Sequence, residues 1–137
     1  MFTLHPTIAQ DTIEIARWSV CRVLLMKDAN YPWLILVPAR EGLGGLHELS
    51  EDDQPLVMHE ICCASRALNG LYIPERINVA ALGNMVPQLH IHVIARFKED
   101  PAWPGPVWGV VPRLDYTAEV LSDTSTKLEA ALKGVIS

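Results

Sequence analysis

Runs of apolar residues predict four strands in this chain. The segments Trp18–Asp28 and Pro32–Arg40 are rich in apolar and β-branched residues, and the turn-forming sequence DANYP lies between them. They predict a β-hairpin. Two further apolar runs, Arg76–Leu82 and Gln88–Phe97, predict two more strands, joined by the short connection GNMVP.

Apolar residues at helical spacing predict two long helices. The first covers Glu51 to about Asn69, with a capping-box-like Ser50 before it and an Asn-Gly pair suited to a left-handed cap at its end. The second is the C-terminal segment Thr117–Val135. Strands and helices together predict an α+β fold, and a length of 137 residues predicts one domain over 1–137.

Composition and charge exclude some classes of partner and indicate a cellular compartment. A net charge of −5 disfavours binding to a nucleic-acid polymer, because non-specific phosphate-backbone binding needs clustered Lys and Arg. The apolar runs are too short to span a membrane, and we expect neither a membrane partner nor a targeting segment. Three cysteines without a C-x-x-C pair fit a reducing cytoplasm.

The fourth strand carries an unusual row of polar residues. Successive side chains of a strand point to opposite faces, so Gln88, His90 and His92 line one face, about 6–7 Å apart. The alternate apolar residues, Leu89, Ile91 and Val93, line the core face. Three hydrogen-bonding side chains in one row indicate a candidate functional surface.

Three interpretations of this row are open. The residues could be solvent-facing positions of a half-exposed sheet. They could bind a metal, although the possible further ligands have no recognisable spacing: His47, His59, Cys62 and Asp100. In the third interpretation a histidine is a nucleophile and its neighbours act as acid, base and orienting groups.

The row resembles a known signature. Gln88-Leu-His90-Ile-His92-Val-Ile is similar to the His-φ-His-φ-His-φ-φ motif of the histidine triad (HIT) superfamily, with Gln at the first position. GNMV stands where that family carries Gly-Gln-Ser/Thr-Val, and AWPGP follows the triad as a Trp-Pro segment does in its phosphoramidate-hydrolysing branch. The order of the predicted strands and helices is similar to that of the family from about Trp18 to Trp108.

The resemblance implies a fold, an assembly and a reaction. It implies an antiparallel sheet of about five strands packed with helices, a homodimer, and hydrolysis or transfer at the α-phosphate of a nucleotide conjugate through a nucleotidyl-histidine. His90 corresponds to the nucleophile, and His92 would contact the phosphate or help to protonate the leaving group. Gln88 can form hydrogen bonds but cannot titrate. We expect no cofactor and no metal, because a neutral imidazole is a competent nucleophile near pH 7.

The turn before the histidines is a candidate phosphate site. Developing charge on the phosphate requires fixed donors, which Asn84 and the backbone N–H groups of Met85 and Val86 could supply. The glycine-rich sequence EGLGG after the hairpin could also cradle a phosphate, but no Gly-Lys-Ser/Thr follows it, and a flexible connection is the alternative.

Four other residues have more than one interpretation. Asp28 corresponds to an acidic residue on the ribose in the family, or it is a turn aspartate. Asn78 faces the pocket of Gln88 or is satisfied by the backbone. Trp103 and Trp108 wall the site, seal a dimer or fill core. At the level of the whole protein, a binding or sensor module without useful turnover is the alternative to an enzyme.

Overall fold

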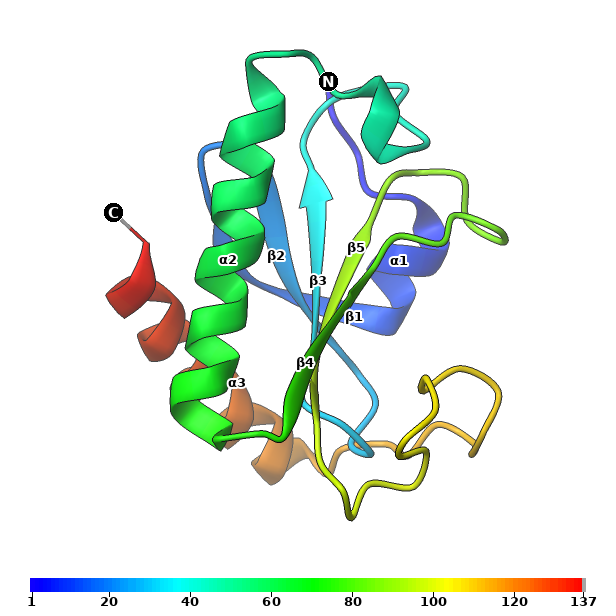
Figure 1. Ribbon diagram of the computed structural model, residues 1–137, viewed down its shortest axis with the longest axis vertical. Coiled ribbons are helices and arrows are strands. Elements are labelled where there is room, and N and C mark those ends of the chain that lie inside the picture. The colour runs from blue at the N-terminus through cyan, green and yellow to red at the C-terminus, as the bar shows by residue number, and fades with distance from the viewer. Residues whose placement is uncertain (137) are drawn as a thin grey trace.

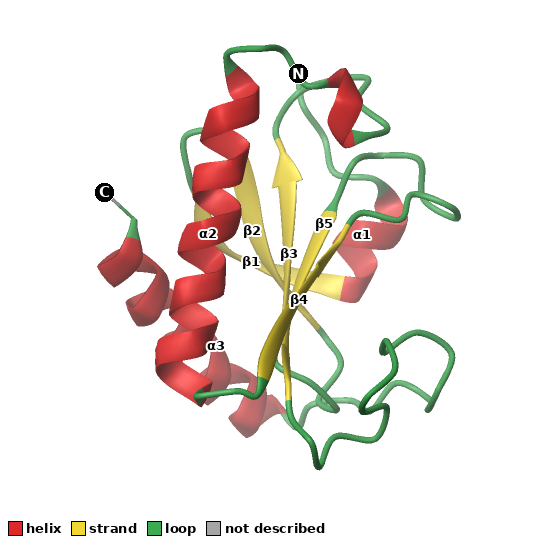
Figure 2. Ribbon diagram, viewed as in Figure 1, coloured by secondary structure: helices red, strands yellow, loops and turns green. Residues whose placement is uncertain are grey.

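The computed structural model describes residues 1–136 and contains one five-stranded sheet (Figures 1 and 2). All neighbouring strands are antiparallel. In spatial order the strands are β1 (Thr12–Arg17), β2 (Cys21–Met26), β3 (Trp33–Pro38), β5 (Ile91–Arg96) and β4 (Arg76–Ala80). The predicted α+β fold with about five antiparallel strands is confirmed.

Helices lie on both faces of the sheet. The long helices α2 (Asp53–Tyr72) and α3 (Ala118–Val135) pack together on one face, as Figure 1 shows, and the short helix α1 (Pro6–Asp11) lies on the other. A single 3-10 turn, η1 (Leu46–Glu48), precedes α2. No helix within residues 1–136 is long and apolar enough to cross a membrane.

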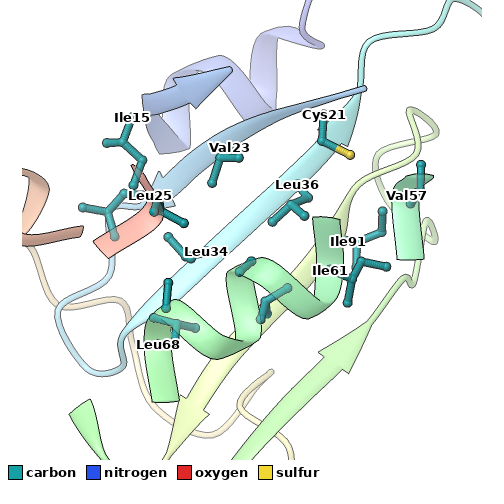
Figure 3. Packing of buried hydrophobic residues seen from close by; sticks show 14 of the residues in the cluster. Ile15, Cys21, Val23, Leu25, Leu34, Leu36, Val57, Ile61, Leu68 and Ile91 are labelled. Carbon is teal, nitrogen blue, oxygen red and sulfur yellow. The ribbon is translucent and has the colours of Figure 1, made fainter. Parts of the chain in front are cut away.

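Each face of the sheet has its own apolar core. The larger one lies between the sheet and the helices α2 and α3, and Figure 3 shows Leu34, Leu36 and Ile91 packed against Ile61 and Leu68 of α2. On the opposite face, a smaller core joins residues of β2, β3 and β5 to α1 and to the loop after β5: Ile8, Leu24, Tyr31, Trp33, Ile35, Val37, Ile94, Ala102 and Val107. Because of these two cores, all six residues of β5 are buried.

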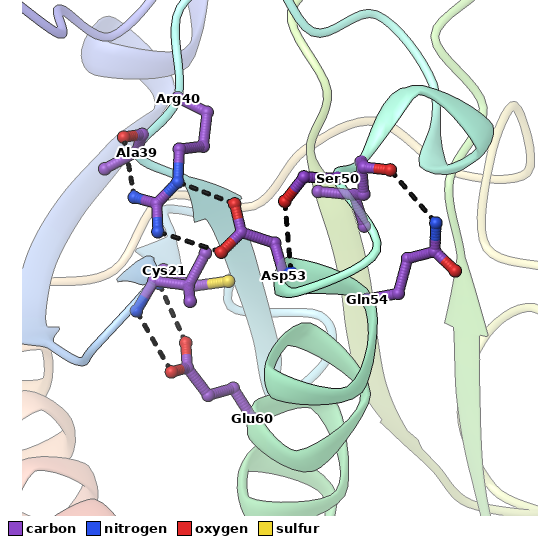
Figure 4. Close-up of polar contacts among 9 residues, drawn as sticks. Cys21, Ala39, Arg40, Ser50, Asp53, Gln54 and Glu60 are labelled. Atoms are coloured by element: carbon purple, nitrogen blue, oxygen red, sulfur yellow. Dashed lines mark hydrogen bonds and ion pairs between the residues drawn. The ribbon is translucent and has the colours of Figure 1, made fainter.

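Polar contacts tie the start of α2 to the hairpin (Figure 4). Glu60 is buried on α2, and its carboxylate accepts hydrogen bonds from the N–H groups of Val20 at 3.1 Å and Cys21 at 2.8 Å. Asp53 accepts from Arg40 Nε at 2.7 Å. The two bonds to Glu60 satisfy the backbone donors at the beginning of β2.

The N-terminal elements and several boundaries differ from the predictions. Helix α1 and strand β1 were not predicted, and β2 to β5 are shorter than the apolar runs that predicted them. Helix α2 ends three residues later than predicted, so Gly70 lies inside it and the left-handed cap is Ile73, at φ 49°. The C-terminal helix is confirmed within one residue.

Candidate functional site

His90 and His92 are buried at the start of β5. Their exposed fractions are 9% and 4%, and their ring centroids lie 5.0 Å apart. The interpretation of the row as solvent-facing positions is therefore wrong. It assumed that only one face of the sheet is covered, whereas the N-terminal segment and the loop after β5 cover the second face.

The hydrogen bond of His90 assigns its tautomer. His90 Nδ1 lies 2.7 Å from the backbone carbonyl oxygen of Gln88. A carbonyl oxygen can only accept, so Nδ1 must carry the proton and donate it. In the neutral ring the lone pair is therefore on Nε2. A histidine held in this way has the orientation and electronic state of a nucleophile or an acceptor.

His92 is held in the opposite tautomer. The indole Nε1 of Trp33 lies 3.1 Å from His92 Nδ1, and an indole N–H can only donate. In the neutral ring Nδ1 is therefore the acceptor, and the proton is on Nε2. Burial, together with the charge of neighbouring His90, lowers the pKa of His92 to about 4. At neutral pH His92 is thus an uncharged N–H donor.

Aromatic rings surround His92. Its ring centroid lies 5.7 Å from that of Trp33 and 5.0 Å from that of Trp108, and the two tryptophans lie 6.0 Å apart. Trp108 is 36% exposed, so it contacts His92 on one side and solvent on the other. Trp108 therefore lies beside the histidine site and does not fill the core.

A cleft of about 520 Å³ opens beside His90. Two connections form it, the one between β3 and α2 and the one between β4 and β5. Its lining residues are Gly44, Gly45, Leu46, His47, Glu48, Ala81, Leu82, Gly83, Leu89 and His90. The two connections are held together by a hydrogen bond of 2.8 Å from Leu89 N–H to the carbonyl of Leu43.

The glycine-rich connection binds a carboxylate of its own chain. The N–H groups of Gly44 and Gly45 both donate to Oε1 of Glu48, each at 2.9 Å. These two bonds lower the pKa of Glu48. The connection thus forms one wall of the cleft, with these two N–H groups turned to Glu48.

Gln88 contacts the N-terminal segment rather than the histidine rings. Its side-chain Oε1 accepts from His5 N–H at 2.8 Å, and its Nε2 donates to the carbonyl of Thr3 at 2.9 Å. Both ends of the amide are thus used to hold residues 3 and 5. The sequence predicted a hydrogen-bonding role for Gln88 but not this partner.

The predicted phosphate donors lie on the connection that leads into the histidines. Asn84 and Met85 are exposed, Met85 at 94%, and Val86 packs against the smaller core. They are not among the lining residues of the cleft. Gly83, just before them, lines the cleft and has a φ of 69°, a backbone conformation that favours glycine.

Asp28 and Asn78 have partners within the protein. Asp28 Oδ1 accepts from the backbone N–H of Asn30 at 3.0 Å and of Leu114 at 3.3 Å, which is the geometry of a turn aspartate. Asn78 Oδ1 accepts from Arg96 at 2.7 Å. Asn78 lies on the same face as the histidines, because it pairs across the ladder with Ile94.

A buried ion pair holds the loop after β5. Arg96 donates to Asp100 at 2.8 Å and 3.1 Å, and these side chains are 1% and 4% exposed. Asp100 also accepts from the N–H groups of Phe97, Ala102 and Trp103. Burial alone would raise the pKa of this carboxyl, but the bonds from Arg96 and the backbone hold it at about 2.

The possible metal ligands are not gathered around the histidines. Asp100 pairs with Arg96, His59 contacts Cys63 on α2, and Cys62 is exposed. Only His47 lies in the cleft with His90. Residues 1–136 contain no group of three His, Cys, Asp or Glu side chains close enough to hold a metal ion.

The sequence does not predict how two residues of the site are placed. Trp33 donates a hydrogen bond to His92, but the pattern of its own strand marks it only as an apolar residue. For His47 the sequence suggests a possible metal ligand and not a place in the cleft beside His90. Its cleft forms between connections far apart in the sequence, and no local signal places them together.

The fold and the buried histidine pair define a histidine triad protein, and comparisons with known proteins agree. The HIT domain model matches residues 10–99. The chain is similar to a histidine triad protein from Bradyrhizobium japonicum, with 44% identity over 96% of this chain and 98% of that chain and a TM-score of 0.93. It is also similar to a histidine triad protein from Marinobacter aquaeolei VT8, with 43% identity over 99% of each chain and a TM-score of 0.95.

A third solved structure, a histidine triad protein from Sinorhizobium meliloti 1021, is 38% identical over 95% of this chain and 96% of that chain, with a TM-score of 0.92. A comparison with curated proteins gives no match. This chain belongs to the HIT domain family.

Proposed function

We propose that this protein binds a nucleotide conjugate and transfers its nucleotidyl group through His90. The lone pair on His90 Nε2 attacks the α-phosphorus, and the bond from phosphorus to the leaving group breaks. Water then attacks the nucleotidyl-histidine and releases the mononucleotide, or another acceptor attacks it and takes over the nucleotidyl group. The observation that carries the proposal is the 2.7 Å bond from Nδ1 to the Gln88 carbonyl, which puts the lone pair on Nε2.

The neighbouring groups fit an anionic phosphorus centre. His92, with its proton on Nε2, supplies a neutral donor to a phosphate oxygen, and its low pKa keeps it in that form. Asn84 and the backbone N–H groups of Met85 and Val86 are the proposed donors from the adjoining turn.

Family membership supports a nucleotide as the ligand. Under this proposal the polar side chains of Asp28 and Asn78 are candidates for sugar or phosphate contacts in addition to their contacts within the protein. Experiment has to identify the nucleobase and the leaving group of the conjugate.

The direct test is to look for the covalent intermediate. The protein is incubated with AMP and GMP conjugates, including phosphoramidates and dinucleoside polyphosphates, and is analysed by mass spectrometry after a rapid quench in base, where the P–N bond survives. We expect a nucleotidyl adduct on His90. His90→Ala should abolish adduct and turnover while still binding the conjugate, and His59→Ala, on α2, should change neither. Undiminished turnover by His90→Ala would refute the proposal.

One observation favours a second candidate, a nucleotide sensor. Gln88 occupies the first triad position, and both ends of its amide are used by the N-terminal segment, so this position gives no proton to a reaction. A sensor would bind nucleotide conjugates without forming an adduct in the unmutated protein. The same incubation distinguishes the two functions.

A further inference from the structure

The proposed reaction needs an acid that the triad positions do not provide. A basic leaving group must receive a proton as its bond to phosphorus breaks. Gln88 has no titratable group, His90 is used as the nucleophile, and His92 is a neutral donor with a lowered pKa. The proton must therefore come from another group in the cleft.

Three titratable side chains line the cleft: His47, Glu48 and His90. The carboxylate of Glu48 accepts two backbone N–H groups, which lower its pKa and keep it ionised, so it is not a proton donor near neutral pH. Histidine is the side chain that ordinarily exchanges protons between pH 5 and 8. His47 is thus the remaining candidate.

The imidazole of His47 lies against Gly45, at the wall of the cleft that contains His90. A Cβ atom at position 45 would lie 2.7 Å from Cε1 and 2.8 Å from Nδ1 of His47. The backbone at Gly45 is extended, with a φ of −140°, so its conformation does not require glycine. The absence of a side chain at Gly45 leaves room for the imidazole in this position. Because His47 is exposed, its ring can also be reached from solvent.

We propose that His47 is the acid and base for the leaving group of the reaction at His90. This inference rests on the proposed function. As the P–N bond to His90 forms, the bond to the leaving group breaks and the imidazolium of His47 gives that group its proton. In the second step His47, now neutral, takes a proton from the attacking water while the P–N bond breaks and its electron pair returns to His90 Nε2.

The surroundings of His47 contain few other charges. Glu48 is on its own turn, and His90 is the titratable group across the cleft. The part of the β4–β5 connection that lines the cleft is uncharged, and so are the α2 residues beside His47: Gln54, Val57, Met58 and Ile61. Glu48 and His90 are therefore the ionisable side chains that accompany His47 in the described lining of the cleft.

The test compares two leaving groups on one nucleotide. The propylamide of AMP needs a proton to leave, whereas the p-nitrophenyl ester of AMP leaves as a stable phenolate. We expect His47→Ala to lower kcat/KM by about 10²–10³-fold for the propylamide and by less than about 5-fold for the ester. His59→Ala is the matched control and should leave kcat/KM unchanged for both substrates.

A second variant keeps the imidazole but moves it. Gly45→Ala should displace the ring of His47 and reproduce the selective loss on the propylamide, with circular dichroism confirming the fold. Equal effects of His47→Ala on the two substrates, or no effect on either, would overturn the role of His47 while an adduct on His90 upholds the proposed function. Absence of any adduct or turnover in the unmutated protein would remove both.

Discussion

Replacing Asp100 by Asn should cost much more stability than its small chemical change suggests. The carboxylate accepts five hydrogen bonds, two from Arg96 and three from backbone N–H groups, and has donors on both oxygens. The NH₂ group of Asn would face at least one of these donors in either orientation. The guanidinium of Arg96 would also remain buried without its counter-ion.

The size of the effect follows from burial. Removing one partner of a buried ion pair costs about 3–5 kcal/mol, whereas an exposed pair contributes about 0–1 kcal/mol. The protein offers a matched comparison in Asp123, which pairs with Lys127 at 3.0 Å with the same i,i+4 spacing but with both side chains at least 60% exposed. We expect a loss of about 3–5 kcal/mol for Asp100→Asn and less than about 1 kcal/mol for Asp123→Asn.

The assay is equilibrium unfolding in urea, followed by far-UV circular dichroism. Tryptophan fluorescence recorded in parallel reports on the loop that carries Trp103 and Trp108. A change of less than about 1 kcal/mol for Asp100→Asn, equal to that of the exposed control, would show that the network does not hold the loop.

Four further outcomes are expected. The pKa of His92 in the folded protein lies below its ordinary value of 6.5, so protonation of His92 favours the unfolded chain. The free energy of unfolding should therefore be highest above about pH 6.5 and should fall by about 3 kcal/mol as the pH drops to 4. Urea titrations of His92→Gln should lack this loss. Gln88→His should not raise turnover and should speed hydrogen exchange of residues 3–5; higher turnover would mean that Gln88 is only a weakened catalytic group. Sedimentation should show a homodimer at micromolar concentration, because β4 is an edge strand with exposed Val79. Turnover should survive EDTA, and a loss restored by zinc would favour a metal enzyme.

The sequence predicted the main elements because their patterns are local. The hairpin, the two long helices and the histidine row each follow from spacing within one segment. Strand β1 is no shorter than β4, but it follows helix α1 directly, and no Gly or Pro between them marks where the strand begins. Helix α1 has six residues, too few for a helical repeat to be recognised.

The candidate site was only partly predictable because its partners come from distant segments. The face shared by His90 and His92 follows from alternation in one strand. Gln88, in contrast, binds residues 83 and 85 positions away, and Trp33 is 59 positions from His92. Such contacts depend on how the chain folds back over the second face of the sheet, and no spacing within a segment encodes them.

Because β5 is buried on both faces, this strand does not tolerate insertions or deletions. A one-residue insertion or deletion just before His90 would turn every following side chain of the strand to the opposite face. The histidines would then point into the core beneath α2, and the aliphatic residues would replace them beside Trp33. A substitution in this strand, such as Ile to Val, can change the packing by a small amount. A change of length would instead place the histidines in the core and the aliphatic residues in the site at the same time.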